Sequence, residues 1–124
     1  MPEDTQKPTD YLTMDPKTQG EFIFAHSSAV ERTEYASRLL KHSSRTFKDP
    51  LAFAWYLQIP ATSLVCTDDP VIPPQLQREM VDKAREKGAN VVIKEIHSDH
   101  VPMVSHPEEV VEVLLEAAKR GLQP

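Results

Sequence analysis

The sequence has 124 residues, 27% charged and 40% hydrophobic, which fits one globular unit and leaves no room for two full domains. Its 14 Lys and Arg against 19 Asp and Glu give a formal net charge of -5, and no basic run exceeds two residues, so nucleic acid is not an expected partner. No apolar run approaches the roughly 18–20 residues of a membrane span, and the polar start of the chain lacks the order of a signal peptide, so we expect a cytoplasmic protein without membrane contact.

Glycine and cysteine are scarce. With only Gly20, Gly88 and Gly121, these 124 residues contain no Gly-rich phosphate loop, no dinucleotide fingerprint and no Gly-x-Ser-x-Gly nucleophile turn. The single Cys66 cannot form an internal disulfide and has no second thiol for a structural zinc site. We expect no cofactor.

The first two regions differ in polarity. Residues 1–14 are predicted to be a flexible N-terminal arm, because the first ten residues are polar, contain proline and offer no hydrophobic side chain after the initial methionine. Residues 15–58 are predicted to be helical, with an Asp-Pro pair opening the first helix and a second helix from about residue 29 to 41. The apolar stretch 51–56 is either one more helical turn or a packed loop.

The third region, residues 59–124, alternates strands with helices. Short runs with β-branched residues at 61–66 and 91–96 are typical of buried parallel strands. Apolar side chains at helical spacing predict a helix over 75–87 between them and another over 107–120 after them. This order predicts an α/β fold with a right-handed, parallel β-α-β-α unit.

Local signals set the ends of these two helices. Gly88 and Gly121 suit the left-handed position that follows a helix. Ser105 and Glu108 have the spacing of a capping box at the start of the last helix.

Acidic and histidine residues follow both predicted strands. The first strand runs into Asp68 and Asp69, and the second runs into a loop that contains His97 and His100. Because the carboxyl ends of parallel strands share one sheet edge, an acid and a histidine are expected to meet there. A carboxylate that accepts from one imidazole nitrogen fixes the tautomer and leaves the other nitrogen free to take a proton from a nucleophile. Asp68 and Asp69 compete for the role of the acid.

Several motifs of the third region stand in the order and spacing of a known family. They are Ile59-Pro60, Val65-Cys66-Thr67-Asp68-Asp69, Ile72-Pro73-Pro74 with Gln77, and Ser98-Asp99-His100-x-Pro102-x-x-Ser105-x-Pro107-Glu108-Glu109-Val110. With these motifs the stretch from Ile59 to Ala118 resembles the C-terminal end of the α/β-hydrolase superfamily, within its esterase-like branch of plant methylesterases and hydroxynitrile lyases.

The resemblance implies roles for particular residues. Asp69 is implied as the acid of a catalytic triad and His100 as its base, in the family's chain order of nucleophile, acid and histidine. Residues 15–58 are similar to part of that branch's helical lid. Under such a lid, four aromatic residues are implied to line an apolar substrate pocket, although aromatic residues in helices are otherwise ordinary core: Trp55, Tyr56, Phe22 and Phe24.

The sequence also departs from the family. The family's nucleophile elbow and oxyanion loop lie before the lid, whereas this sequence resembles only the lid and the segments C-terminal to it, so we expect a truncated protein with an incomplete triad. Without the serine no acyl-enzyme forms, and without the backbone donors no oxyanion is stabilised. Hydrolysis by these residues alone is therefore not expected.

The sequence gives weaker support to a metal site and to a cysteine nucleophile. His97, Asp99 and His100 carry metal-ligand side chains, but a loop at a strand end rarely points three close neighbours inward, so no metal site is expected. Cys66 lies inside a predicted buried strand, where a thiol acts as a small hydrophobe and not as a nucleophile.

Two functional hypotheses remain. The first is an esterase-like protein that acts on a small ester or related molecule, by hydrolysis or by lyase chemistry. Some members of the superfamily serve secondary metabolism, which the residues themselves do not address. The second is a non-catalytic remnant that binds a small apolar ligand or a partner chain. A two-stranded unit leaves strand edges unpaired beside Leu64 and Val65, which predicts association with itself or with another chain.

Overall fold

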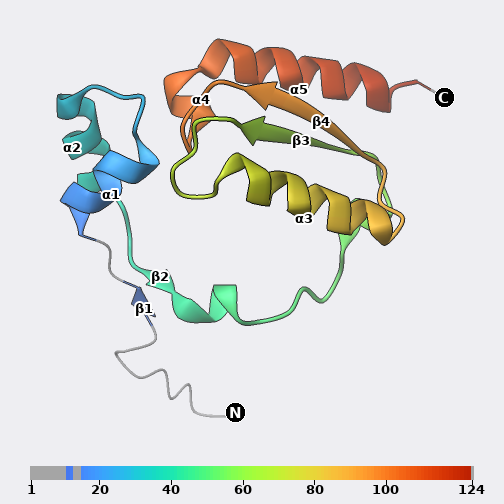
Figure 1. Cartoon of the computed structure of the whole chain (residues 1–124), viewed down its shortest axis with the longest axis horizontal. Coiled ribbons are helices and arrows are strands. Elements are labelled where there is room, and N and C mark those ends of the chain that lie inside the picture. The colour runs from blue at the N-terminus through green and yellow to red at the C-terminus, as the bar shows by residue number, and fades with distance from the viewer. Residues whose placement is uncertain (1–10, 13–14, 124) are drawn as a thin grey trace.

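The computed structural model describes residues 11–12 and 15–123. In chain order the elements are β1 (Tyr11–Leu12), α1 (Pro16–Ile23), α2 (Ala29–Ser37), β2 (His42–Ser43), the 3-10 turns η2 (Ser44–Phe47) and η3 (Trp55–Leu57), β3 (Ala61–Cys66), α3 (Pro74–Glu86), β4 (Val91–Ile96), α4 (Pro102–Ser105) and α5 (Pro107–Gly121). Figure 1 shows the α1–α2 pair beside the ends of β3 and β4, and a long loop leading back to the start of β3.

The strand pair β3 and β4 is the centre of the fold. The two strands are parallel, in register from Ala61 opposite Val91 to Cys66 opposite Ile96. Helix α3 connects them and α5 follows, and the two helices flank the pair from opposite sides (Figure 1). The predicted strands and the β-α-β-α order are confirmed.

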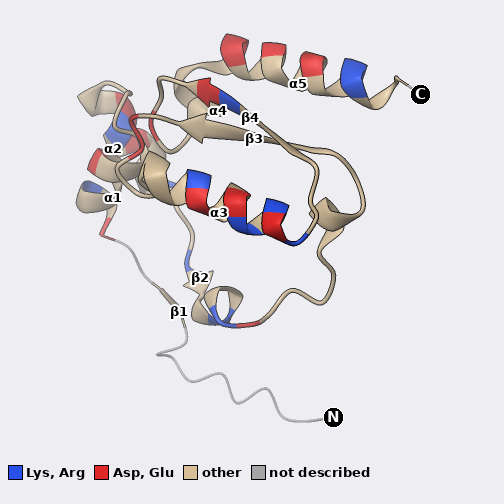
Figure 2. Cartoon of the chain, turned by 45° about the vertical axis from the view of Figure 1, so that its right-hand side comes forward, with Lys and Arg blue, Asp and Glu red and all other residues tan. Residues whose placement is uncertain are grey.

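The helix ends follow the local signals only in part. Gly88 has a φ of 92°, which confirms its place after α3. The prediction for Gly121 is wrong, because α5 continues through it and its φ is not positive. The capping box is also wrong: His106 precedes α5, and Ser105 belongs to α4. Acidic residues in the first turn of α5 and basic residues in its last turn suit the helix dipole (Figure 2).

The helices of the N-terminal region have clear caps. The Asp15 carboxylate accepts from the backbone N–H of Thr18 at 3.1 Å. Helix α2 starts with a capping box between Ser28 and Glu31. It ends at Ser37, not at residue 41 as predicted, because the chain leaves the helix to pair β2 with β1.

Two contacts hold α1 against α2. Gly20 is buried where the helices approach, and a Cβ there would lie 3.1 Å from the carbonyl oxygen of Arg32. The rings of Phe24 and Tyr35 pack with centroids 5.3 Å apart. Close approach and aromatic packing therefore make this pair of short helices one unit.

Small residues form the core of the β-α-β-α unit. The buried apolar side chains of this unit are Ala61, Val65, Cys66, Val81, Ala89 and Ile96. Large apolar side chains of α5 stay outside it, since Val111, Leu114 and Leu115 are each more than half exposed. Within the described ranges, no helix is both long and apolar enough to cross a membrane.

Candidate active site

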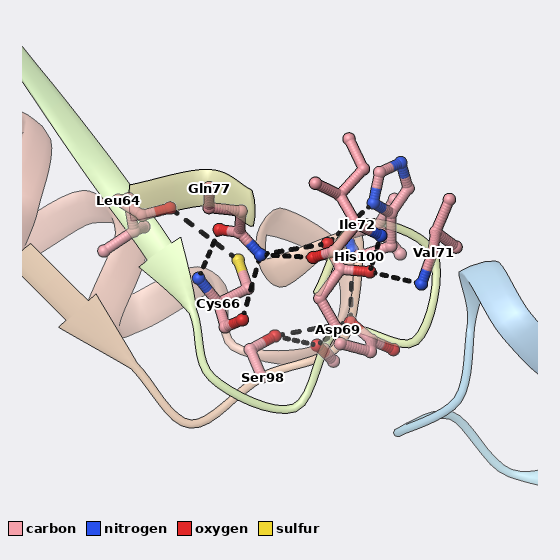
Figure 3. Close-up of polar contacts among 11 residues, drawn as sticks. Leu64, Cys66, Asp69, Val71, Ile72, Gln77, Ser98 and His100 are labelled. Atoms are coloured by element: carbon pink, nitrogen blue, oxygen red, sulfur yellow. Dashed lines mark hydrogen bonds and ion pairs between the residues drawn. The ribbon is translucent and has the colours of Figure 1, made fainter. Parts of the chain in front are cut away.

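The loops after β3 and β4 bring Asp69 and His100 together. The Nδ1 atom of His100 lies 2.9 Å from Oδ2 of Asp69, although 31 residues separate them in sequence (Figure 3). Each residue comes from the carboxyl end of a parallel strand, as the sequence predicted. The pair is therefore a product of the sheet topology and not of local sequence.

The Asp69 carboxylate is fixed in place. Its side chain is 5% exposed, and Oδ1 accepts from the backbone N–H groups of Val71 at 2.8 Å and Ile72 at 3.1 Å. Oδ2 faces His100. Asp68, the competing acid, has a side chain that is 57% exposed and bonds His26 instead. The structure thus assigns Asp69, and not Asp68, as the partner of His100.

His100 combines a fixed nitrogen with an open one. With Asp69 accepting, Nδ1 carries the proton and Nε2 keeps its lone pair. In the described part of the chain, no side chain or backbone group bonds Nε2, and the side chain is 31% exposed. This nitrogen can take a proton from a hydroxyl placed beside it.

Gln77 of α3 contacts the end of β3 and the turn that carries Asp69. Its Oε1 accepts from the backbone N–H of Cys66 at 2.9 Å, and its Nε2 donates to the Cys66 carbonyl at 3.1 Å. The same amide group donates to the Ile72 carbonyl at 2.7 Å and lies 3.4 Å from Oδ2 of Asp69 (Figure 3). Gln77 thus pairs with the end of β3 as a neighbouring strand would, and it closes the turn that holds Asp69.

Asp99 organises the loop that carries His100. It is fully buried, and Oδ1 accepts from the Val101 N–H at 3.2 Å and the Ser105 hydroxyl at 3.0 Å. Oδ2 accepts from the His26 N–H at 2.9 Å, which ties the α1–α2 loop to the strand ends. The Ser105 hydroxyl, at the end of α4, therefore donates to Asp99 and does not cap α5.

Sequence reasoning missed His26. Its Nε2 lies 2.5 Å from Oδ2 of Asp68, and this hydrogen bond holds the pKa of the Asp68 carboxyl below its usual range. The rings of His97 and His106 lie 5.5 Å and 5.3 Å from that of His26. No local signal marks His26, because 42 residues separate it from Asp68.

The four aromatic residues implied to line a pocket lie in two separate parts of the fold. Trp55 and Tyr56 pack on each other in η3, which leads into β3 from the opposite end of the strand pair (Figure 1). Phe24 is buried against Tyr35, and Phe22 is 47% exposed on α1. A hollow of about 580 Å³ between α1 and α2 is lined by none of the four.

Cys66 lies at the end of β3, as predicted, and is 6% exposed. Burial, with smaller contributions from the charges of Asp69 and Asp99, raises the pKa of its thiol. The thiol is therefore protonated near neutral pH, and a protonated, buried thiol is a poor nucleophile.

Comparison with known proteins bears on the family and the fold. Residues 7–113 match the Alpha/beta hydrolase family. The chain is 33% identical over 86 residues to Probable hydrolase R7 of Phoma sp., covering 68% of this chain and 35% of that protein. It is 31% identical over 87 residues to Alpha/beta hydrolase nvfD of Aspergillus novofumigatus, covering 70% and 34%.

More distant similarities point to esterases. Methylesterase 1 of Arabidopsis thaliana is 31% identical over 65 residues, covering 52% of this chain and 24% of that protein. The crystal structure of polyneuridine aldehyde esterase superposes with a TM-score of 0.71 at 26% identity, covering 90% of this chain and 46% of that one. The chain thus spans about a third of the length of the first two relatives.

Proposed function

The chain belongs to the alpha/beta hydrolase family, and on that premise we propose that Asp69 and His100 are the acid and base of a serine-hydrolase triad acting on a small carboxylic ester. The observation that carries this proposal is the bond from His100 Nδ1 to Asp69 Oδ2, with Nε2 left open. Nε2 takes the proton of a serine hydroxyl as that oxygen attacks the ester carbonyl. Asp69 holds the tautomer and stabilises the imidazolium that forms.

The nucleophile in this proposal comes from outside these 124 residues. The three glycines do not flank a serine in a Gly-x-Ser-x-Gly turn, which in this fold presents the serine beside the histidine. The backbone N–H donors of the oxyanion hole would likewise come from outside the 124 residues. The 124 residues by themselves therefore supply only the proton-transfer part of the chemistry, and they are inactive alone.

A serine-reactive probe tests the source of the nucleophile. We expect the purified 124-residue protein to resist a fluorophosphonate probe and to leave a panel of p-nitrophenyl esters unhydrolysed. Probe labelling that disappears in His100→Ala would contradict a nucleophile from outside these residues, since it would show a reactive serine within them. Sequencing the transcript upstream of the Met1 codon is expected to reveal a Gly-x-Ser-x-Gly turn.

The tautomer of His100 tests the acid–base pair directly. Long-range proton–nitrogen NMR spectra report which imidazole nitrogen carries the proton. We expect the Nδ1–H form in the native protein and the Nε2–H form in Asp69→Asn, because an asparagine amide donates to Nδ1. Asp68→Asn is the matched control, since its partner is His26 and not His100. The same tautomer in native protein and Asp69→Asn would reject the pairing.

A second candidate function, binding of a partner strand, has its own observation. The N–H groups of Ala61 and Thr67 donate toward β4, so the alternate residues Thr62 and Leu64 direct their backbone groups to the open edge of β3. A partner strand, or β3 of a second copy, would satisfy them. Sedimentation at rising concentration is expected to show association. A monomer that binds no apolar dye would reject this candidate.

A further inference from the structure

Three side chains of types that can ligate a metal lie near one another at the strand ends that also carry Asp69 and His100. His26 comes from the α1–α2 loop, Asp68 follows β3 and His97 follows β4, and one ligand atom from each lies within 4.8 Å of the others. This histidine cluster (His26, Asp68 and His97) joins three segments that are far apart in sequence.

The backbone of the cluster is held from several sides. The N–H of His26 donates to Asp99, and the guanidinium of Arg32 donates to the carbonyls of the residues before and after His26. The N–H of Asp68 donates to the Ser98 carbonyl at 3.1 Å, which fixes the end of β3 against that of β4. The three side chains thus project from anchored positions, as a binding site requires.

Small side-chain rotations would bring the three donors onto one ion. A tetrahedral Zn²⁺ with ligand bonds of about 2.0–2.1 Å sets its donor atoms about 3.3 Å apart. The Asp68 side chain is 57% exposed and His97 is also exposed, so both have room to turn. The cost is the His26–Asp68 hydrogen bond, which the ion replaces with two ligand bonds.

The donor set selects the class of ion. Two imidazoles and one carboxylate suit Zn²⁺ and its neighbours Co²⁺, Ni²⁺ and Cu²⁺, whereas Mg²⁺ and Ca²⁺ prefer oxygen ligands. Three protein ligands leave the fourth tetrahedral position to water. If Nε2 of His97 binds the ion, the Thr67 hydroxyl, which lies 3.5 Å from Nδ1, would orient the imidazole from its other nitrogen.

We propose that the histidine cluster binds a divalent ion of the zinc class and clips the α1–α2 loop to the ends of β3 and β4. The cluster is not the set weighed from the sequence. Both oxygens of Asp99 are bonded within the fold and His100 faces Asp69, so only His97 is common to the two sets. The proposal is independent of the triad, because neither Asp69 nor His100 is a ligand.

Cobalt binding tests the site on the intact 124-residue protein. Co²⁺ in a tetrahedral site absorbs strongly in the visible range, so a titration gives both stoichiometry and geometry. We expect one ion per chain, displaced by Zn²⁺ but not by Mg²⁺. His97→Ala removes a ligand and is expected to raise the Kd by more than about tenfold.

Control variants distinguish a specific metal site from non-specific binding of the ion. His42 bonds Thr46 and lies outside the cluster, so His42→Ala should leave the Kd unchanged. Asp68→Asn gives a second variant at an exposed position, and circular dichroism checks that each variant folds. Absence of the tetrahedral spectrum would overturn the proposal. An equal Kd in native protein and His97→Ala, or an equal loss in His42→Ala, would do so too. The His100 tautomer should stay unchanged in His97→Ala, so failure of the site and failure of the triad are distinguishable.

Discussion

The hydrogen bonds of Gln77 predict that Gln77→Ala destabilises the protein. Its side chain makes three hydrogen bonds of 3.1 Å or shorter to backbone groups, two at Cys66 and one at Ile72. Alanine removes all three and gives those groups no protein partner. Each such bond contributes about 1 kcal/mol net, so the free energy of unfolding should fall by about 2–3 kcal/mol.

Urea unfolding measured by circular dichroism is the assay. With a slope of about 1–2 kcal/mol per molar urea for a small protein, the midpoint should fall by about 1–3 M. Gln75→Ala is the matched control, because Gln75 lies two positions earlier in α3 and bonds only the exposed Glu79 side chain. Its effect should stay within about 0.5 kcal/mol. Equal destabilisation by the two substitutions would refute the role of Gln77 at the edge of β3.

Three further predictions concern backbone and titrating groups. Gly88→Ala should lower the free energy of unfolding by about 1 kcal/mol, because Gly88 has a positive φ. The control Gly121→Ala lies in helical backbone and should not lower it. Equal losses in urea unfolding would contradict the role of the positive φ. Cys66 should react with a disulfide reagent at least about tenfold more slowly when folded than in urea, and equal rates would contradict its burial. In an NMR titration, His26→Ala should raise the pKa of Asp68 toward its ordinary value of 3.8. Because the pKa of Asp68 is lowered in the folded protein, the His26–Asp68 hydrogen bond stabilises the fold above about pH 4, and this stabilisation is lost as the pH falls. An unchanged Asp68 pKa in His26→Ala would contradict the assignment of the shift to His26.

Much of the fold was predictable because its signals are local. The strands at 61–66 and 91–96 have β-branched runs bounded by turn residues, and the structure has them at those bounds. Helix α3 begins and ends one residue before the prediction, with Gly88 beyond it. The helix expected to reach residue 41 stops at Ser37 because pairing of β2 with β1, a non-local contact, competes with it.

The candidate active site also combines features that the sequence predicts with features that depend on tertiary contacts. The sequence determined that an acid and a histidine would stand at one sheet edge, because parallel strands bring their carboxyl ends together. The residues themselves left Asp68 and Asp69 as alternatives, and the family resemblance implied Asp69. The tertiary structure places Asp69 against His100, in the turn that Gln77 closes. It also placed His26 beside Asp68, across 42 residues of chain. Such contacts depend on how the α1–α2 loop packs against the strand ends, and no local pattern encodes that packing.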